Sequence, residues 1–366
     1  MKGYLFGIIS IFLFYGCKKD NSDTTAEASS AKTVLFYIAA NNDLRLDALE
    51  SLNKIKMGYK FNPNHRILIY LKTESNKSHL LALRHHGVDT LYSFGNDNSS
   101  DPKFFKKVIS YAQSVYSSQI SGIVLWSHAT SWKPKPKMKS FGQDEGIEMD
   151  IKELAKALPD NMEFLVFDAC TMASIEVLYE FKNKTKYILA SPAEILSTSF
   201  PYDNSINELF LGIDGLEKAA ANFLSYYENQ TGLYQSATIS LVQTDKLESI
   251  ARETSKLLLS KTLVYPFNKE KIQQLTFERS GNVPSYDYIS VLRNNYTYNE
   301  FLSLERAIQE AVLFKGSTKL FLGNEIVDYC GLTVYLPESD DPYFDYYSSL
   351  QWNSDSGWSR IFKGEN

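Results

Sequence analysis

The sequence predicts an α/β fold with a largely parallel central sheet and helices on both of its faces. Two apolar runs, residues 123–126 and 164–167, have the composition of strands that are buried on both faces of a parallel sheet. Between them, residues 151–158 show a helical pattern, which suits the crossover that joins two parallel strands. Strands and helices alternate along the rest of the chain, and this alternation is typical of layered α/β folds.

Turn residues and apolar periodicity predict the remaining elements. The Asn-Asn-Asp sequence at 41–43 offers a turn and an N-cap before a helix that places Leu49, Leu52 and Ile55 on one side. Asp101 is the expected N-cap of a helix that runs to Ser117. Further strands are expected at residues 33–40, 66–71, 80–83, 90–94, 237–242 and 332–336. Further helices are expected at residues 216–227, 245–259 and 298–314.

Two residues that follow the buried strands are candidates for chemistry. Cys170 stands where the second strand turns into a helical pattern, and the unpaired N–H groups of a helix start would stabilise a thiolate. His128 follows the first strand, and adjacent parallel strands end at the same edge of a sheet. We therefore expect the two side chains to face each other, as nucleophilic catalysis by a cysteine requires. The alternatives are an inert buried cysteine and a half-buried imidazole.

Five stretches, in order along the chain, resemble the clostripain-like cysteine peptidases, which are relatives of the caspases, legumain and gingipains. They are TVLFYIAANNDL at 33–44, LWSHATSW at 125–132, FDACTMASIEVLYE at 167–180, SPAE at 191–194 with PYD at 201–203, and GLTVYLP at 331–337 with SGW at 356–358. The resemblance implies a caspase-like catalytic core, which we place at residues 33–215. Residues 216–366 are expected to form a C-terminal α/β extension that packs on this core.

The resemblance also implies a mechanism, and the sequence departs from the family pattern at two positions beside the histidine. Cys170 would attack the carbonyl that follows a basic residue, His128 would protonate the leaving amine, and the backbone N–H groups of Cys170 and Ala129 would hold the oxyanion. Ala129 and Ser131 stand where the family usually has Gly. A Cβ at a position that needs φ > 0 costs on the order of 1 kcal/mol. An alternative function is therefore a binding protein that keeps the peptidase fold with impaired turnover.

Asp168 is a candidate for substrate recognition. It precedes Cys170 by two positions on a strand, so both side chains project to the same face. A carboxylate beside a thiol opposes formation of the thiolate, so Asp168 makes more sense as the floor of a pocket that binds a substrate Arg or Lys. The resemblance implies the same role, with Glu194 as a possible second acid. The alternative is a carboxylate that caps the following helix.

The first 17 residues have the pattern of a processing signal. Lys2 supplies a positive start, and residues 5–14 are an apolar core that is too short to span a bilayer. A small residue before Cys17 resembles a bacterial lipoprotein signal, which implies a lipidated Cys17 and an exported, membrane-anchored protein in the periplasm or on the cell surface. A plain secretory signal is the alternative. The polar residues 18–32 indicate a flexible tether.

A basic loop separates the histidine block, residues 125–132, from the cysteine block, residues 167–180. The sequence Lys-Pro-Lys-Pro-Lys-Met-Lys at 133–139 indicates an exposed, extended segment, because alternating Pro excludes a helix or a central strand. Clostripain-like enzymes often cut themselves between these blocks after Arg or Lys. The resemblance therefore makes Lys137 and Lys139 candidates for self-cleavage, and a solvated basic loop is the alternative.

Composition and the motifs that are missing exclude several other classes. A net charge of −5 over 366 residues argues against nucleic acid as a partner. The three cysteines do not make a disulfide scaffold, and Cys330 is expected in the core. Zinc-peptidase, serine-hydrolase and phosphate-loop motifs are missing, so no cofactor is expected. Some family members bind calcium, but no acid-rich loop resembles such a site. The expected partner is a peptide or protein with basic residues.

Overall fold

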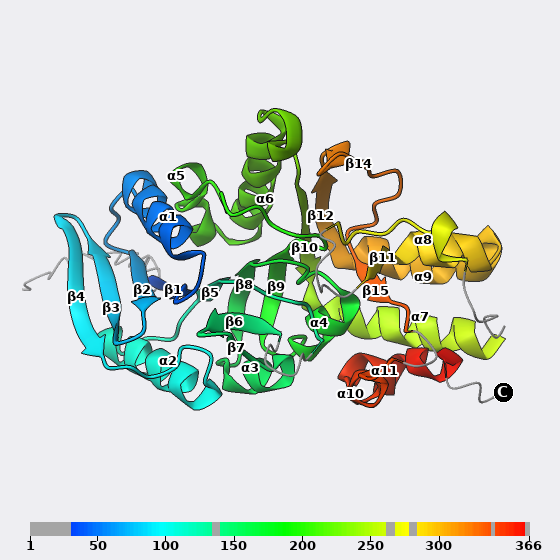
Figure 1. Cartoon of the computed structure of the whole chain (residues 1–366), viewed down its shortest axis with the longest axis horizontal. Coiled ribbons are helices and arrows are strands. Elements are labelled where there is room, and N and C mark those ends of the chain that lie inside the picture. The colour runs from blue at the N-terminus through cyan, green and yellow to red at the C-terminus, as the bar shows by residue number, and fades with distance from the viewer. Residues whose placement is uncertain (1–30, 134–139, 261–267, 278–283, 338–340, 363–366) are drawn as a thin grey trace, which may run out of the picture. The chain divides into compact units, whose positions relative to one another are not determined.

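The computed structural model describes residues 31–133, 140–260, 268–277, 284–337 and 341–362, which belong to one compact unit, Ala31–Asn366. A nine-stranded sheet runs through it in the order β12-β10-β9-β8-β5-β1-β2-β3-β4 (Figure 1). Its strands are β1 (Lys32–Ala39), β2 (His65–Glu74), β3 (Lys77–Arg84), β4 (Gly87–Phe94), β5 (Gly122–Trp126), β8 (Met162–Asp168), β9 (Thr185–Ala190), β10 (Thr238–Gln243) and β12 (Val312–Ser317). The five strands from β9 to β2 are parallel, and antiparallel strands extend both edges. The predicted, largely parallel α/β sheet is confirmed.

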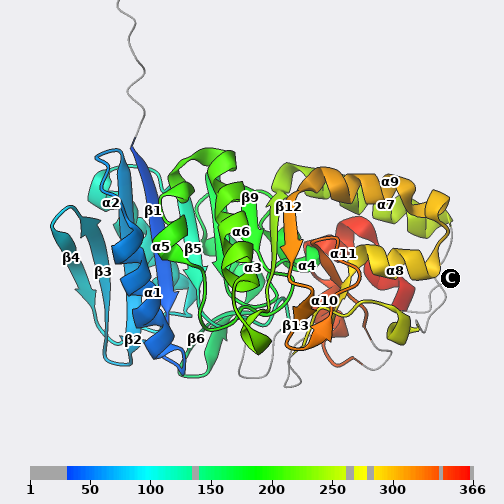
Figure 2. The ribbon, with the colours of Figure 1, turned by 90° about the horizontal axis from the view of Figure 1, so that it is seen from above.

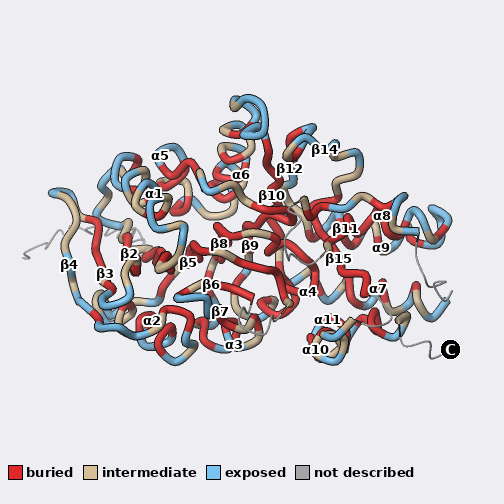
Figure 3. Tube along the Cα trace, in the orientation of Figure 1, coloured by how far each residue is buried: buried red, intermediate tan, exposed pale blue. Residues whose placement is uncertain are grey.

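Both faces of the central sheet are buried, as the apolar runs predicted. Along β1, Leu35 and Tyr37 belong to one hydrophobic core, and Phe36 and Ile38 belong to the other. One face is covered by α1 (Arg45–Gly58), α5 (Tyr202–Ser205) and α6 (Gly212–Glu228). The opposite face is covered by α2 (Pro102–Tyr116), α3 (Ile151–Ala157) and α4 (Ile175–Glu180), as Figure 1 shows. Burial follows this layering, with the central strands buried and the outer helix surfaces exposed (Figure 3).

The C-terminal part of the chain continues the same sheet. Strand β10 pairs with β9, and β12 pairs with β10, so no break in the sheet marks the expected boundary at residue 216. Beyond β12 lie α7 (Leu247–Ser260), α8 (Tyr288–Asn295) and α9 (Tyr298–Ala311), as Figure 2 shows. A small sheet of β11 (Ser285–Asp287) and β15 (Thr333–Tyr335) completes this part together with α10 (Phe344–Ser348) and α11 (Gln351–Ser356). Two further hairpins are β6 (Phe141–Asp144) with β7 (Ile147–Met149), and β13 (Leu320–Phe321) with β14 (Asn324–Glu325).

Some local predictions agree with these elements, and others do not. Asp101 caps α2, since its side chain accepts the N–H groups of Lys103 and Phe104 at 2.9 and 2.8 Å. The predicted helix at 298–314 is too long, because α9 ends at Ala311 and the next residues pair with β10. Strand β9 and the β6–β7 hairpin were not predicted. Within the described residues, no helix is both long enough and apolar enough to cross a membrane.

Candidate active site

Three loops converge at the carboxyl edge of the parallel strands. The chain passes from β1 to β2 on one side and later returns to the other side of β1 with β5, so the strand order reverses between β1 and β5. Ligand crevices form at such reversal points. Asp43 follows β1, His128 follows β5 and Cys170 follows β8, and all three line one cavity of about 530 Å³. The structure therefore brings the two predicted reactive side chains into one cavity, together with a carboxylate.

Cys170 lies in a turn and not at a helix start. Strand β8 ends at Asp168, Thr171 has a left-handed φ of +58°, and α4 begins only at Ile175. The expected stabilisation of a thiolate by this helix is therefore wrong, because the intervening turn separates the sulfur from the first helical N–H groups. The sulfur instead contacts the backbone of Ile195, whose N–H it accepts at 3.4 Å and whose carbonyl lies at 3.7 Å.

His128 has a carboxylate partner that the sequence did not reveal. Its Nε2 lies 2.8 Å from Oδ1 of Asp43, and this hydrogen bond lowers the pKa of the Asp43 carboxyl. The Asn-Asn-Asp sequence at 41–43 was expected to supply a turn and an N-cap before α1. Asn42 serves the turn, since its side chain accepts the Leu44 N–H at 2.9 Å, but the predicted cap is wrong, because the N-cap residue is Leu44 and no side chain caps the helix. One signal was present in the sequence, since Asp43 also follows an apolar strand at this edge of the sheet.

Asp168 lines the cavity and is almost fully buried. Its Oδ2 accepts hydrogen bonds from the hydroxyl groups of Ser199 and Tyr202, the latter at 2.6 Å, and from the Phe200 N–H at 3.5 Å. Burial raises the pKa of Asp168 to about 6, while the Ser199 and Tyr202 hydrogen bonds act in the opposite direction. Asp168 does not cap α4, because the Ser174 hydroxyl takes that position and accepts a helix N–H.

A left-handed backbone, which is costly for a residue with a Cβ, was considered for Ala129 and Ser131 but occurs only at Ser131. Ser131 has a φ of +59°, whereas Ala129 is not among the described residues with positive φ. Ala129 opposes Phe141 in a bridge whose hydrogen bonds use the neighbouring residues, His128 O with Gly142 N and Ser140 O with Thr130 N. In such a pair the N–H of Ala129 points away from the partner strand. The bridge therefore does not use the backbone N–H of Ala129, a residue that lines the cavity.

Glu194 does not belong to this cavity. Its carboxylate is buried and accepts the backbone N–H of Phe277 at 3.0 and 3.2 Å. It is missing from the residues that line the cavity around Cys170. The neighbouring residues Ile195, Leu196 and Ser197 line the cavity instead. The expectation that Glu194 supplies a second pocket acid is not met.

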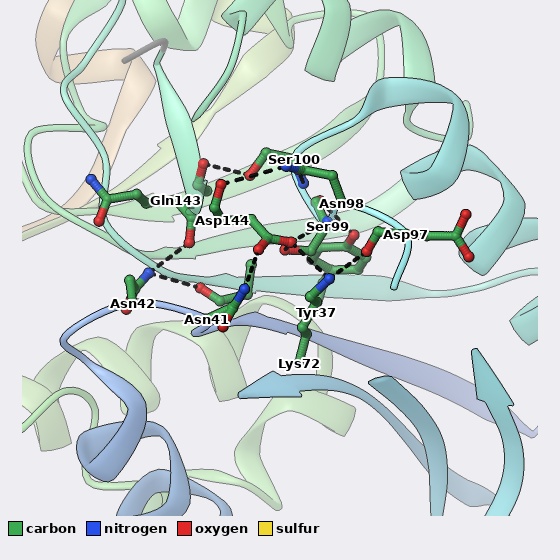
Figure 4. A network of polar contacts seen from close by, with 12 residues as sticks. Tyr37, Asn41, Asn42, Lys72, Asp97, Asn98, Ser99, Ser100, Gln143 and Asp144 are labelled. Carbon is green, nitrogen blue, oxygen red and sulfur yellow. Dashed lines mark hydrogen bonds and ion pairs between the residues drawn. The ribbon is translucent and has the colours of Figure 1, made fainter. Parts of the chain in front are cut away.

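A buried ion pair between Lys72 and Asp144 binds the turn after β1, and Figure 4 shows the polar network around it. The Lys72 ammonium lies 3.1 Å from Oδ2 of Asp144, and both side chains are 2% exposed. Asp144 also accepts the Asn41 amide at 2.6 Å, two residues before Asp43. It accepts the N–H and hydroxyl of Ser99 at 2.6 and 2.9 Å. The turn after β1 and the β6 strand are thereby tied to one buried charge.

Strand β6 in turn contacts the loop that carries His128, residues 127–132, which we call the histidine loop. The Gly142 N–H donates to the His128 carbonyl at 3.0 Å, and the Gln143 N–H donates to the Ser127 hydroxyl at 3.1 Å. The Ser127 hydroxyl donates to the Ala39 carbonyl at the end of β1 at 2.6 Å. These hydrogen bonds connect the end of β1 and strand β6 to the residues that follow β5, next to the imidazole. The network therefore positions His128 and Asp43 relative to each other.

The C-terminal part supports the other side of the site. Trp132, in the histidine loop, is fully buried and packs against Tyr335 and Tyr347, with ring centroids 5.0 and 4.7 Å apart. Glu176 of α4 accepts the Tyr335 N–H at 2.8 Å and the Tyr347 hydroxyl at 3.0 Å. The loop after His128 and the helix after Cys170 thus rest on the same C-terminal segment.

Three sequence expectations lie outside the described residues: Cys17 as a lipidation site, and Lys137 and Lys139 as self-cleavage candidates. Cys330 is buried, as expected for a core residue. In the part of the chain that the structure describes, no group of three or more His, Cys, Asp or Glu side chains is arranged to hold a metal ion.

A thiol and an imidazole that share one cavity are the groups that a cysteine peptidase requires. The clostripain family model matches residues 36–364, so the chain belongs to this family of cysteine peptidases and is a cysteine-type endopeptidase. It is 22% identical to clostripain from Hathewaya histolytica over 442 aligned positions, covering 94% of this chain and 83% of that protein.

Solved structures give the same assignment. A secreted cysteine protease from Bacteroides thetaiotaomicron, solved with an irreversible peptide inhibitor, is 26% identical, with a TM-score of 0.79 over 90% of this chain and 99% of that chain. An inactive protease zymogen from Parabacteroides distasonis is also 26% identical, with a TM-score of 0.77 over 89% of this chain and 98% of that chain. The predicted family and caspase-like fold are confirmed.

The buried ion pair gives a prediction about stability. Replacing Asp144 by Ala is expected to lower the free energy of unfolding by about 3–5 kcal/mol, because the Lys72 ammonium is left buried without its counter-charge. Denaturant unfolding measures this difference. The matched control is Asp160→Ala, which removes the surface ion pair between Asp160 and Lys184, whose charged atoms lie 2.6 Å apart. This substitution should lower the free energy of unfolding by about 1 kcal/mol or less. Equal effects of the two substitutions would contradict the role assigned to Asp144.

Proposed function

We propose that this protein is an exported, lipid-anchored cysteine endopeptidase that hydrolyses peptide bonds after Arg or Lys through a Cys170–His128 dyad. The observation that carries the proposal is the shared cavity, in which Cys170 and His128 lie with the buried carboxylate of Asp168. Membership of the clostripain family supports the reaction class. The dyad, the basic preference and the anchor are the parts that experiments must test.

Asp43 gives each nitrogen of His128 a separate task. In the neutral imidazole one ring nitrogen carries a proton and the other accepts one. Since Nε2 lies against the Asp43 carboxylate, it keeps the proton, and Nδ1 is the nitrogen that exchanges protons with Cys170 and the substrate. Asp43 also stabilises the imidazolium that forms when the thiol is deprotonated. It is therefore a positioning residue that acts through His128.

The reaction then proceeds in two steps. The Cys170 thiolate attacks the scissile carbonyl, and His128 gives its proton to the leaving amine, which releases the first product and leaves a thioester. His128 next removes a proton from water as the water attacks the thioester, and the sulfur is expelled. The oxyanion of each tetrahedral state is held by the backbone N–H groups of Cys170 and Ala129.

The preference for basic residues rests on Asp168. The carboxylate lies two residues before the nucleophile and lines the same cavity, so a substrate side chain that reaches it leaves its own carbonyl near Cys170. The described residues that line this cavity include Asp43, Glu148 and Asp168 but no Lys or Arg. A cationic side chain is thus favoured over an anionic one.

The anchor and the location of the protein rest on the first 17 residues, with Cys17 as the lipidated residue and residues 18–32 as the tether. Export places the enzyme on a membrane that faces the periplasm or the outside. The alternative of an impaired binding protein is not favoured. It rested on Ala129 and Ser131, and only Ser131 has a left-handed backbone.

The dyad is tested by three substitutions in one assay. Cys170→Ala should abolish cleavage of a fluorogenic Lys or Arg peptide, and Asp43→Asn should lower kcat/KM by roughly tenfold or more, because His128 loses the charge that orients it. Glu50→Gln, an exposed acid on α1, serves as the control and should leave kcat/KM unchanged. Cleavage that survives Cys170→Ala would reject Cys170 as the nucleophile, and an Asp43→Asn variant as active as wild type would reject the role of Asp43.

The buried carboxyl of Asp168 predicts how activity depends on pH. Only the ionised form attracts a basic side chain, and burial raises the pKa of this group to about 6. The kcat/KM for basic peptides should therefore fall as the pH drops through about 6, since the pH dependence of kcat/KM reports the ionisation of groups in the free enzyme. The rate at which iodoacetamide alkylates Cys170 serves as the control, because this reagent does not use Asp168. Identical pH profiles for the two reactions would count against Asp168.

The anchor is tested by the behaviour of the full chain expressed in a bacterial host. Wild-type protein should enter the detergent phase in a phase-separation experiment, because a lipid chain adds about 0.8 kcal/mol of apolar transfer energy for each buried CH₂ group. Cys17→Ala should move the protein to the aqueous phase, and Cys170→Ala should not. A wild-type protein that is released without lipid would favour the plain secretory signal.

A further inference from the structure

One oxygen of the Asp168 carboxylate is already bound from inside the protein. The indole N–H of Trp126 donates to the Ser199 hydroxyl at 2.9 Å. Because an indole can only donate, Ser199 accepts this bond and directs its own proton to Oδ2 of Asp168. The Tyr202 hydroxyl donates to the same oxygen at 2.6 Å. A weaker contact from the Phe200 N–H, at 3.5 Å, also ends on Oδ2.

These donors cannot easily turn away when a substrate enters. Ser199 is buried with a left-handed φ of +64°, and its carbonyl accepts the Tyr227 hydroxyl at 2.9 Å. The Tyr202 ring is buried against Phe36, with ring centroids 5.3 Å apart. Burial and the nearby Asp168 carboxyl raise the pKa of Tyr202 well above its usual value, so the phenol keeps the proton that it donates. Oδ2 therefore stays occupied.

The other oxygen, Oδ1, accepts no hydrogen bond among the described residues, and Asp168 lines the cavity that contains Cys170. A guanidinium group binds a carboxylate best through two parallel hydrogen bonds, one to each oxygen. An ammonium group is a compact charge that needs one oxygen for its strongest contact. A carboxylate with a single available oxygen therefore removes the advantage of Arg and keeps that of Lys.

We propose that this pocket selects Lys over Arg at the residue before the scissile bond, and that Ser199 and Tyr202 set this preference by occupying Oδ2 of Asp168. The inference rests on the proposed function and makes it narrower. Ser199 and Tyr202 are positioning residues, because they act on the substrate through the carboxylate.

The test compares kcat/KM for two fluorogenic peptides that differ only in Lys or Arg before the scissile bond. For the wild-type enzyme, Lys should be preferred by about tenfold or more, the effect of one charge-assisted hydrogen bond. Tyr202→Phe removes one donor and frees a lone pair of Oδ2, so the ratio of Lys to Arg efficiency should fall toward one or below it. The matched control is Tyr288→Phe, which removes a buried hydroxyl that bonds Thr254 at 2.7 Å outside this cavity and should leave the ratio unchanged.

Equal or better cleavage of the Arg peptide by the wild-type enzyme would overturn the inference. A folded Tyr202→Phe variant with an unchanged ratio would overturn the role of Oδ2. If that variant does not fold, Ser199→Ala removes the other donor and gives the same test. Failure of the proposed function would look different, because neither peptide would be cleaved or cleavage would survive Cys170→Ala.

Discussion

The site depends on the parallel register of β1, β5 and β8. Ile38 pairs with Trp126, and Trp126 pairs with Asp168, so the three strands end at the same level. Each strand is buried on both faces and cannot shift by one residue without moving apolar side chains between the two cores. The side chains that follow these strands are therefore delivered to one edge, although Asp43 and Cys170 are far apart in the chain.

The register alone does not orient the side chains, and two supports do so from opposite sides. On one side, the buried Lys72–Asp144 pair ties the turn before Asp43 to β6, which in turn contacts the histidine loop. On the other side, the C-terminal segment packs against Trp132 and binds Glu176 of α4. A buried charge pair is weak evidence for added stability but good evidence for a fixed arrangement, since losing one partner is costly. The expected C-terminal extension is thus a structural part of the site.

The cavity around Cys170 contains a buried carboxylate, Asp168, that is hydrogen-bonded through one of its two oxygens. Ser199 and Tyr202 bind one side of Asp168, which compensates part of the cost of burying the group. Burial still raises the pKa of Asp168 to about 6, so the group is ionised at neutral pH but sensitive to mild acid. If Asp168 binds the substrate as we propose, the same hydrogen bonds that allow the charge to be buried restrict how a substrate side chain can approach it.

By itself, the sequence determined the α/β class, the strands that end at the site, and the identity of His128, Cys170 and Asp168 as candidates. These depend on local signals: apolar runs, the polar residues that follow them, and motif blocks. Only the tertiary structure decided that Asp43 contacts His128, that Glu194 binds the backbone of Phe277 and that α4 begins after a turn. It also decided that residues 312–317 form an edge strand, because their pairing with β10 joins segments about 75 residues apart. Partners brought together by chain reversals leave no periodicity to read, which is why the sequence located the reactive residues but not the contacts that orient them.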